Sequence, residues 1–405
     1  MFVVQRYGTE IGGGSEQCCR LYAENCLARG HHVEVATSCA KNYTNWANEF
    51  PSGPTVVNKV LVHRFPVDRE RSGSAFSALD GAVVWSGATT PLSVQHLWIE
   101  EMGPRTLDMS NFLRSRADDI DVFVFFTYLY YPTAKGLLAL SGLAPTLFHP
   151  TAHVEPHLWV PVFEDVFRAA DTYGFLTPEE RDLVHDRFGI EPISDVVGVG
   201  VDLVAEGSGP RFRSVYGLEN TPYLLYVGRI DPGKGSLEMY DFFWAYKRRH
   251  PGPLKLVIVG EPVITLPPND SIIVTGYLSE SDKLDAIAGC TAFLQPSYFE
   301  SFSMALTEAW SQGRPAIVQG RCDVLAGQAR RSGGGIPYVG FAEFEAAVDE
   351  LLSDETLADA MGRNGRDYIE KMYRWDTIMD RYDVLLDETV AAHNQRWPQI
   401  SRTNP

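Results

Sequence analysis

Short apolar runs alternate with amphipathic stretches along the whole chain, and this alternation predicts strands and helices in turn. The first apolar run, Phe2–Val4, leads through a glycine loop at Gly12–Gly14 into an amphipathic stretch that reaches Arg29. Ser15 is the candidate N-cap of that helix. Val33–Ala36 then resumes as a strand. This order predicts the first βαβ unit of a doubly wound parallel sheet.

The same alternation continues through the first half of the chain. We expect strands at Val56–Phe65, Val122–Phe126, Pro145–His149, Thr172–Leu176 and Val196–Val199, and helices at Met109–Ala117 and Pro178–Phe188. Residues 66–100 show no clear period. There we expect loops and short helices.

Residues 205–210 have the composition of a linker, and the alternation restarts beyond them. We expect strands at Tyr223–Val227, Leu254–Val259, Ile272–Val274, Ala292–Gln295 and Ala316–Val318, with helices at Ser236–His250 and Trp375–Gln395. Ser401–Pro405 should fray. Two rounds of alternation predict an α/β protein of two Rossmann-like domains. The first domain would hold residues 1–203 and 376–405, and the second would hold residues 204–375.

Length and net charge limit the kinds of domain organisation and binding partner that this chain can have. A chain of 405 residues exceeds what one hydrophobic core usually serves, which agrees with two domains. The net charge of −17 argues against a nucleic-acid partner. The start shows no targeting signal, and the most apolar run, Val122–Tyr131, is far shorter than the roughly 20 residues of a spanning helix. We expect a cytoplasmic protein without a membrane span, which leaves room for a peripheral membrane contact.

The segment Pro296–Glu308 carries the strongest chemical signal. It follows an apolar strand and opens a helix, so backbone amides near Ser301–Met304 should point outward without intrahelical partners. Such a helix start attracts phosphate through its free donors and its dipole. Glu300 lies just before the helix and Glu308 within it, where both carboxylates could accept hydrogen bonds from sugar hydroxyls.

Two other interpretations of these glutamates stay open. A glutamate beside a helix start often serves only as a dipole partner or as a member of a capping box. Two carboxylates can also serve a glycoside hydrolase, but those flank the scissile bond from opposite sides. The phosphate-binding helix start between Glu300 and Glu308 favours a nucleotide sugar instead.

A second signal follows the strand Tyr223–Val227. Gly228 ends the strand, and a tight loop presents Arg229 and Lys234 before the next helix. Arginine can fork onto a diphosphate, and lysine adds a mobile point charge. The alternative is a solvated loop in which Asp231 pairs with Lys234.

With these motifs in order, the chain resembles glycosyltransferase family 4. The resemblance rests on the Gly13–Glu16 loop, the Gly198–Asp202 turn, Gly228–Arg229 with Lys234, and two glutamates separated by seven residues. It covers nearly the whole chain and implies the GT-B fold, in which two Rossmann-like domains face each other across a cleft. It also implies a nucleotide-sugar donor and retention at the anomeric carbon.

The resemblance implies roles for particular residues. Arg229 and Lys234 would hold the donor diphosphate, Glu300 would bind sugar hydroxyls, and Glu308 would bind the ribose. The other donor-binding candidates are glycines that approach the phosphate, amides near the helix start and positions that border the base: Gly13, Gly14, Gly228, Ser301, Phe302, Ser303, Met304, Gly276 and Tyr277. No cofactor and no metal are expected, because positioned cations and a helix start can stabilise a departing diphosphate.

One departure from the family concerns histidine. Many relatives carry a histidine after the strand that corresponds to Val122–Phe126, and this chain has none there. The next strand is instead followed by His153 and Glu155, which could orient the acceptor or the donor sugar. For His149 we expect a partly buried structural histidine, and for His157 a surface one.

Together these features predict a retaining, metal-independent glycosyltransferase of polysaccharide or glycoconjugate biosynthesis. It would move a hexose-type sugar from a nucleotide-diphosphate sugar to a glycan, a lipid-linked molecule or a small molecule. The alternatives are a non-catalytic nucleotide-sugar or glycan-binding protein, and an epimerase or phosphorylase on the same fold. The expected partners are the donor and an acceptor that the sequence does not identify.

Overall fold

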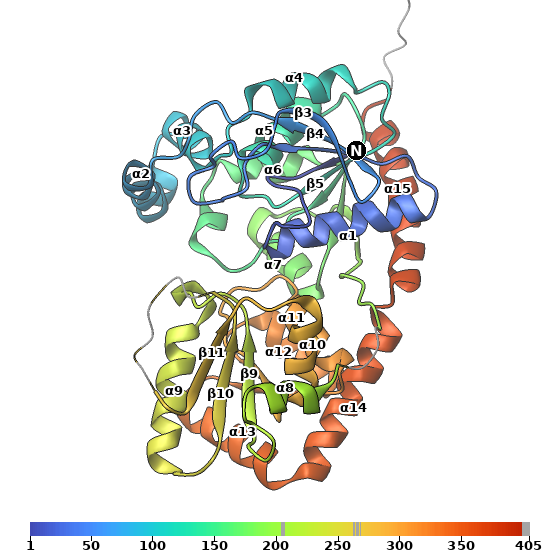
Figure 1. Cartoon of the computed structure of the whole chain (residues 1–405). Helices are drawn as coiled ribbons and strands as arrows, with labels where there is room; N and C mark the ends of the chain where they lie inside the picture. Colours follow the sequence, from blue (N-terminus) through green and yellow to red (C-terminus); the bar gives the residue numbers. More distant parts are fainter. Residues whose placement is uncertain (204–206, 262–263, 265–266, 268, 399–405) are drawn as a thin grey trace, which may run out of the picture. The chain divides into compact units, whose positions relative to one another are not determined.

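The chain divides into two compact units in the computed structural model, which describes residues 1–203, 207–261, 264, 267 and 269–398 (Figure 1). The first unit holds Met1–Gly198 and Met379–Pro405, and the second holds Val199–Ile378. These divisions lie a few residues from the predicted ones. The expected fraying of Ser401–Pro405 and the first part of the expected linker lie outside the described residues.

The first unit is built on an eight-stranded sheet in the order β3-β4-β2-β1-β5-β6-β7-β8. Only β3 and β4 pair antiparallel, and the other neighbours are parallel. The strands are β1 (Phe2–Val3), β2 (Glu34–Ser38), β3 (Gly53–Val57), β4 (Val60–Phe65), β5 (Phe123–Phe126), β6 (Thr146–His149), β7 (Thr172–Phe175) and β8 (Ile193–Val196). The central strands are continuous apolar runs because both of their faces are buried.

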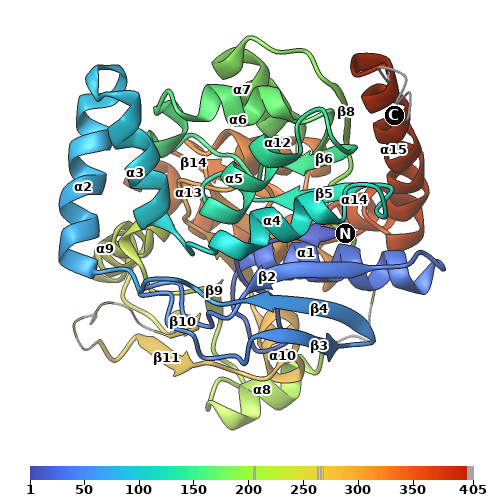
Figure 2. The ribbon, with the colours of Figure 1, turned by 90° about the horizontal axis from the view of Figure 1, so that it is seen from above.

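Helices flank this sheet (Figure 2). The core between them includes Phe125, Phe148 and Tyr173. The helices are α1 (Gly14–Ala28), α2 (Gly73–Ser86), α3 (Leu92–Met102), α4 (Leu107–Ser115), α5 (Tyr131–Leu140), α6 (Phe163–Ala169) and α7 (Pro178–Phe188), with short 3-10 turns η1 (Gly87–Thr89) and η2 (Pro156–Trp159). Helix α15 (Trp375–Arg396) begins in the second unit and packs most of its length on the first, where Arg381 pairs with Asp195.

The second unit has an all-parallel, six-stranded sheet in the order β11-β10-β9-β12-β13-β14. Its strands are β9 (Tyr223–Val227), β10 (Lys255–Val259), β11 (Ile272–Gly276), β12 (Ala292–Gln295), β13 (Ala316–Gln319) and β14 (Gly335–Tyr338). Its helices are α8 (Gly209–Val215), η3 (Pro232–Lys234), α9 (Ser236–Arg249), α10 (Glu280–Gly289), α11 (Met304–Ser311), α12 (Asp323–Ser332), α13 (Phe341–Ser353) and α14 (Glu355–Met372). The expected α/β class with two Rossmann-like domains is therefore confirmed.

The expectation of loops and short helices over residues 66–100 holds only in part, because the helices there have 14 and 11 residues. Two helices, α2 and α3, lie there and pack against each other (Figures 1 and 2). Apolar residues occur around the whole circumference of α2, and Val83 is its only buried residue. A helix of this composition has no apolar stripe, so the period of 3.6 residues does not stand out in its sequence.

Two local predictions in the first unit also fail. The single strand expected at Val56–Phe65 is a hairpin of β3 and β4, because Asn58 and Lys59 both have positive φ (47° and 69°) and turn the chain. Ser15 is not the N-cap of α1. That position falls to Gly13, which makes no side-chain capping bond.

Among the described residues, no helix is both long and apolar enough to cross a bilayer.

Candidate functional site

The strand order of the second unit reverses between β9 and β12. From β9 the chain steps outward to β10 and β11, whereas β12, β13 and β14 lie on the other side of β9. Open parallel sheets bind ligands at such a switch point, in the crevice beyond the carboxyl ends of the strands. The loops that follow β9 and β12 are the two segments that carry most of the expected site residues.

The loop after β9 is fixed by its own hydrogen bonds. The Tyr226 hydroxyl donates to the carbonyl of Arg229 at 2.8 Å, and the Asp231 side chain accepts from the amide of Gly233 at 2.8 Å. Ser236 donates to the carbonyl of Asp231 at 2.8 Å. The backbone that presents Arg229 and Lys234 is therefore held by residues within the loop and its flanks.

Lys234 pairs with Glu300 from the loop after β12. Its Nζ lies 2.9 Å from Glu300 Oε1, and the two side chains are 36% and 14% exposed. The structure thus joins two of the expected catalytic residues. The alternative in which Asp231 pairs with Lys234 is wrong, because the Asp231 carboxylate caps the short helix η3 instead.

A glycine lets the two loops approach. Gly235 has φ of 68°, and a Cβ there would lie 2.1 Å from the carbonyl oxygen of Pro296. Only glycine combines this left-handed backbone with so close a contact. The sequence therefore needs Gly235 for the Lys234 loop to pack on the segment that carries Glu300.

The helix start in the Pro296–Glu308 segment lies later than expected. Helix α11 begins at Met304 and Ser303 is its N-cap, so Ser301 and Phe302 precede the helix. Ser303 has φ of 78°, and its hydroxyl accepts a hydrogen bond from Gln295 at 2.7 Å. The Phe302 side chain is buried against Tyr373. Of these positions, only the amides at the start of α11 keep the expected character of free helix donors.

Glu308 has a partner that the sequence analysis did not identify. Lys283 Nζ lies 2.9 Å from Glu308 Oε1 and 2.8 Å from Glu280 Oε2. Burial raises the pKa of Glu308, and Lys283 opposes that rise. Lys283 lies one turn into α10, and no motif in the sequence connects it with a glutamate on α11.

Glycines end the three strands on one side of the switch point, β9, β10 and β11, which lie side by side in Figure 1. The amide of Gly228 donates to Val259, the amide of Gly260 donates to Gly276, and a Cβ on Gly260 would meet the carbonyl of Gly228 at 2.1 Å. Tyr277 follows directly and is 77% exposed. Gly276 and Tyr277 thus lie at the carboxyl end of β11, and their expected role beside a base stays a prediction.

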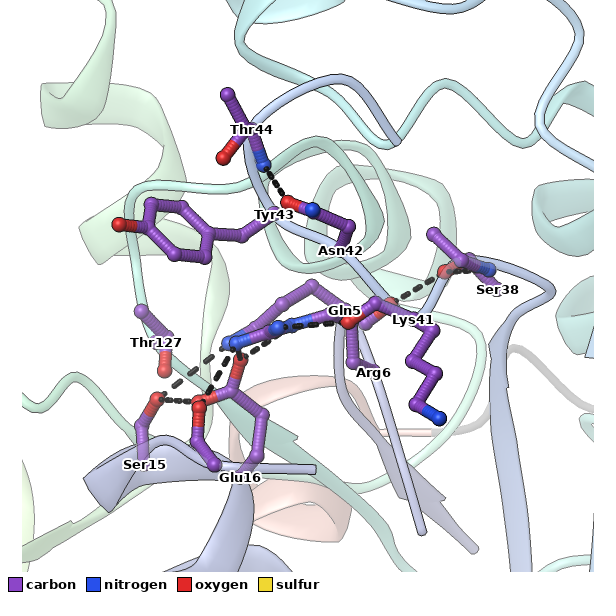
Figure 3. Close-up of polar contacts among 12 residues, drawn as sticks. Gln5, Arg6, Ser15, Glu16, Ser38, Lys41, Asn42, Tyr43, Thr44 and Thr127 are labelled. Carbon is purple, nitrogen blue, oxygen red and sulfur yellow. Dashed lines mark hydrogen bonds and ion pairs between the residues drawn. The ribbon is translucent and has the colours of Figure 1, made fainter. Parts of the chain in front are cut away.

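In the first unit, the loop of Gly13 and Gly14 rests on a buried ion pair (Figure 3). The Arg6 guanidinium donates to Glu16 Oε1 through Nε at 2.9 Å and through Nη2 at 2.5 Å. Both side chains are 7% exposed. A Cβ on Gly13 would lie 2.3 Å from Glu16 Oε2, whereas Gly14 faces open space. The pair explains why glycine stands at position 13, and sequence analysis missed Arg6.

The same guanidinium also ties neighbouring backbone to this loop. Arg6 Nη1 donates to the carbonyl of Lys41 at 2.9 Å, and the Ser15 hydroxyl donates to Glu16 Oε2 at 3.0 Å (Figure 3). Arg6 follows β1 and Lys41 follows β2, so one side chain joins two strand ends to the first turn of α1. The glycine loop is therefore a fixed element of the first unit.

His153 and Glu155 lie together as expected, within a larger network. His153 Nδ1 is 3.7 Å from Glu155 Oε1, which also accepts a hydrogen bond from Tyr128 at 2.6 Å. His157 is no ordinary surface histidine, because it lies 3.4 Å from Glu155 and 3.1 Å from Asp80. Burial alone would lower the pKa of His157, but these carboxylates raise it to about 9.

The backbone before His153 is held by a buried carboxyl group. Glu180 accepts hydrogen bonds from the amides of Ala152 and Leu176, each at 2.7 Å. Burial raises the pKa of Glu180 to about 8. His149 at the end of β6 is fully buried beside Tyr382, and burial lowers its pKa to about 3. His149 is therefore structural, and it is more deeply buried than expected.

Comparison with known proteins agrees with this architecture. Residues 210–368 match the family model for glycosyl transferases group 1. A putative glycosyltransferase, YtcC of Bacillus subtilis, is 23% identical over 51% of this chain and 58% of its own length. A GDP-mannose-dependent phosphatidylinositol monomannoside mannosyltransferase of Mycobacterium tuberculosis is 23% identical over 62% of this chain and 72% of its own. The match to YtcC thus spans somewhat more than half of that relative.

Solved structures resemble the chain over nearly its whole length. A sucrose-phosphate synthase from Thermosynechococcus elongatus superposes with a TM-score of 0.70 at 16% identity, covering 96% of this chain and 98% of its own. Anabaena HepE in complex with UDP-glucose gives a TM-score of 0.69 at 13% identity with the same coverage. At such identities the likeness concerns the fold. The chain has the GT-B fold, and most of its second unit matches the group 1 glycosyl transferases.

Proposed function

We propose that this chain is a retaining glycosyltransferase of family 4 that moves a hexose-type sugar from a nucleotide-diphosphate sugar to an acceptor without a metal cofactor. The observation that carries the proposal is the Lys234–Glu300 pair at the switch point between β9 and β12. A cation and a carboxylate at that point suit a ligand with phosphate at one end and sugar hydroxyls at the other.

The proposed chemistry follows from the charges. The bond between the anomeric carbon and the diphosphate oxygen breaks, and a bond from that carbon to the acceptor oxygen forms. The acceptor proton moves to the departing diphosphate. Arg229 and Lys234 stabilise the negative charge that develops on the leaving group, while Glu300 orients the sugar hydroxyls. Both bond changes take place on one face of the sugar, so retention needs no enzyme nucleophile.

The relatives support a nucleotide-sugar donor. The mycobacterial mannosyltransferase depends on GDP-mannose by its name, and HepE was solved with UDP-glucose. These ligands share a nucleoside diphosphate and a hexose and differ in the base. In this proposal Glu308 binds the ribose, Gly276 and Tyr277 border the base, and His153 orients the sugar or the acceptor.

The test uses the purified full chain and a panel of uridine, guanosine and thymidine diphosphates and their sugars. We expect one base series to raise the melting temperature, since a ligand that binds only the folded state stabilises it. Release of the diphosphate with an acceptor extract should continue in EDTA. NMR of the product should show the anomeric configuration of the donor.

Matched variants sharpen this test. Arg229→Ala and Glu300→Gln should each weaken donor binding and abolish transfer, whereas Lys371→Met, which removes an exposed lysine of α14, should change neither. Binding without turnover by any acceptor would indicate a binding protein. Dependence on inorganic phosphate would indicate a phosphorylase, and release of an epimerised sugar without acceptor would indicate an epimerase.

A further inference from the structure

Lys283 and Glu308 connect two helices, α10 and α11, that contact each other in the second unit. Lys283 lies on α10, which follows β11, and Glu308 lies on α11, which follows β12. Their side chains are only 13% and 21% exposed, and Nζ lies 2.9 Å from Oε1. A contact this sheltered from water is stronger than an exposed ion pair of the same length.

The ion pair engages only one of the two carboxylate oxygens of Glu308. Lys283 holds Oε1, and no hydrogen bond to Oε2 is found among the described residues. An ionised carboxylate offers about four acceptor positions. Glu308 therefore presents one oxygen that is fixed in place by a cation and a second oxygen that can accept from a ligand.

The charge of Glu308 also depends on its partner. Burial raises the pKa of this carboxyl group and so favours its neutral form. Lys283 opposes that effect, while Glu280, the other charged neighbour along α10, adds to it. A protonated carboxyl group has fewer acceptor positions for hydroxyl donors. By favouring the ionised form, Lys283 keeps Glu308 an acceptor.

We propose that Lys283 is a positioning residue that holds Glu308 ionised and oriented to accept hydrogen bonds from the vicinal hydroxyls of the donor's ribose. This inference rests on the proposed function, because it takes Glu308 as the ribose ligand. Lys283 itself does not touch the nucleotide. It acts through the carboxylate, so its effect depends on whether the ligand has hydroxyl groups to donate.

That dependence gives a test in which the ligand and the protein are changed together. Isothermal titration would measure binding of uridine and guanosine diphosphates and of their 2′,3′-dideoxy counterparts to the full chain. For the diphosphate that binds, we expect Lys283→Met to weaken affinity about tenfold, which corresponds to about 1.4 kcal/mol. The matching dideoxy compound should bind the variant and the unaltered protein equally, and Lys283→Arg should restore most of the loss.

A control variant on α8, which pairs with α10, separates positioning from general damage. Arg211 pairs with Asp285 of α10, so Arg211→Met breaks an ion pair of that helix without touching Glu308. This variant should bind both ligands as the unaltered protein does. The inference is overturned if Lys283→Met weakens binding of the dideoxy compound by the same factor. It is also overturned if the variant stays folded and binds both ligands as tightly as the unaltered protein. If no member of the full donor panel described under the proposed function binds the unaltered protein, the proposed function itself fails.

Discussion

Lys234 and Glu300 stand 66 positions apart in the chain, yet the lysine Nζ lies 2.9 Å from the glutamate Oε1. Each residue belongs to a loop at the carboxyl end of a strand, and the two strands, β9 and β12, are direct neighbours. The pair therefore lies at the point where the strand order of the sheet reverses. If the proposed function is correct, a donor binds against this pair.

Removal of the Lys234 charge should lower the rate of transfer more than it lowers donor affinity. The amine is proposed to meet charge that grows as the diphosphate departs, and loss of one such donor typically costs about 100- to 1,000-fold in kcat. Steady-state kinetics of Lys234→Met would measure kcat and KM separately. Lys234→Arg keeps the charge and should retain more activity, and a rise in KM alone would contradict the role in charge stabilisation.

Loss of Arg6 should destabilise the first unit strongly. The Arg6–Glu16 pair is buried, and removal of one partner leaves an uncompensated charge that costs about 3–5 kcal/mol. Urea unfolding of Arg6→Met would show this loss, and the double variant Arg6→Met, Glu16→Gln should recover part of it. Arg20→Met breaks a more exposed pair with Glu24 and should cost about 0.5 kcal/mol or less. Equal losses from the two arginines would refute this account.

Stability should depend on pH through His157. The pKa of this histidine is about 9 in the folded chain, above its ordinary value of 6.5. A raised pKa means that the folded state binds the proton more tightly, so the contribution is complete below about pH 6.5 and is lost as pH rises to 9. A shift of this size corresponds to roughly 3 kcal/mol. At pH 6, His157→Gln should therefore have a lower free energy of unfolding than the unaltered protein. At pH 10 the difference between the two free energies should be smaller.

Gly235 should tolerate no side chain. Alanine there would adopt a left-handed backbone at a cost of about 1 kcal/mol and would also drive its Cβ into the carbonyl of Pro296. Gly189 at the end of α7 has a similar φ of 58° but nothing within 4 Å of the added carbon. Gly189→Ala thus measures the backbone cost alone. Chemical denaturation should show a clearly larger loss for Gly235→Ala, together with a loss of donor binding.

Much of the fold follows from local patterns. Most strands of both sheets are largely apolar, and their positions agree with the expected ranges to within a few residues, whereas β14 was not expected. The exceptions have physical causes. Helix α2 shows no apolar stripe, because its sequence is apolar on all sides, and the turn at Asn58 and Lys59 depends on two positive φ angles that neither residue requires.

Part of the candidate site could be identified in the same way. Gly228, Arg229, Lys234 and the two glutamates stand in loops and helix starts directly after predicted strands, where parallel sheets bind ligands. Arg6, Lys283 and Asp80 could not be identified, because no local motif connects them with their partners, which lie 10, 25 and 77 positions away. Ser303 was recognised, but its left-handed backbone and the later start of α11 were not.

By itself, the order of apolar and polar residues determined that the chain forms two parallel sheets with functional groups at the strand ends. The alternation of apolar and polar stretches and the turn residues are local properties of the sequence, and they determine where the strands and helices of each sheet form. Tertiary structure alone decided which charges neutralise one another: Lys234 with Glu300, Lys283 with Glu308, and Arg6 with Glu16. Such pairings depend on how loops and helices pack at the strand ends, and that packing is a property of the tertiary structure.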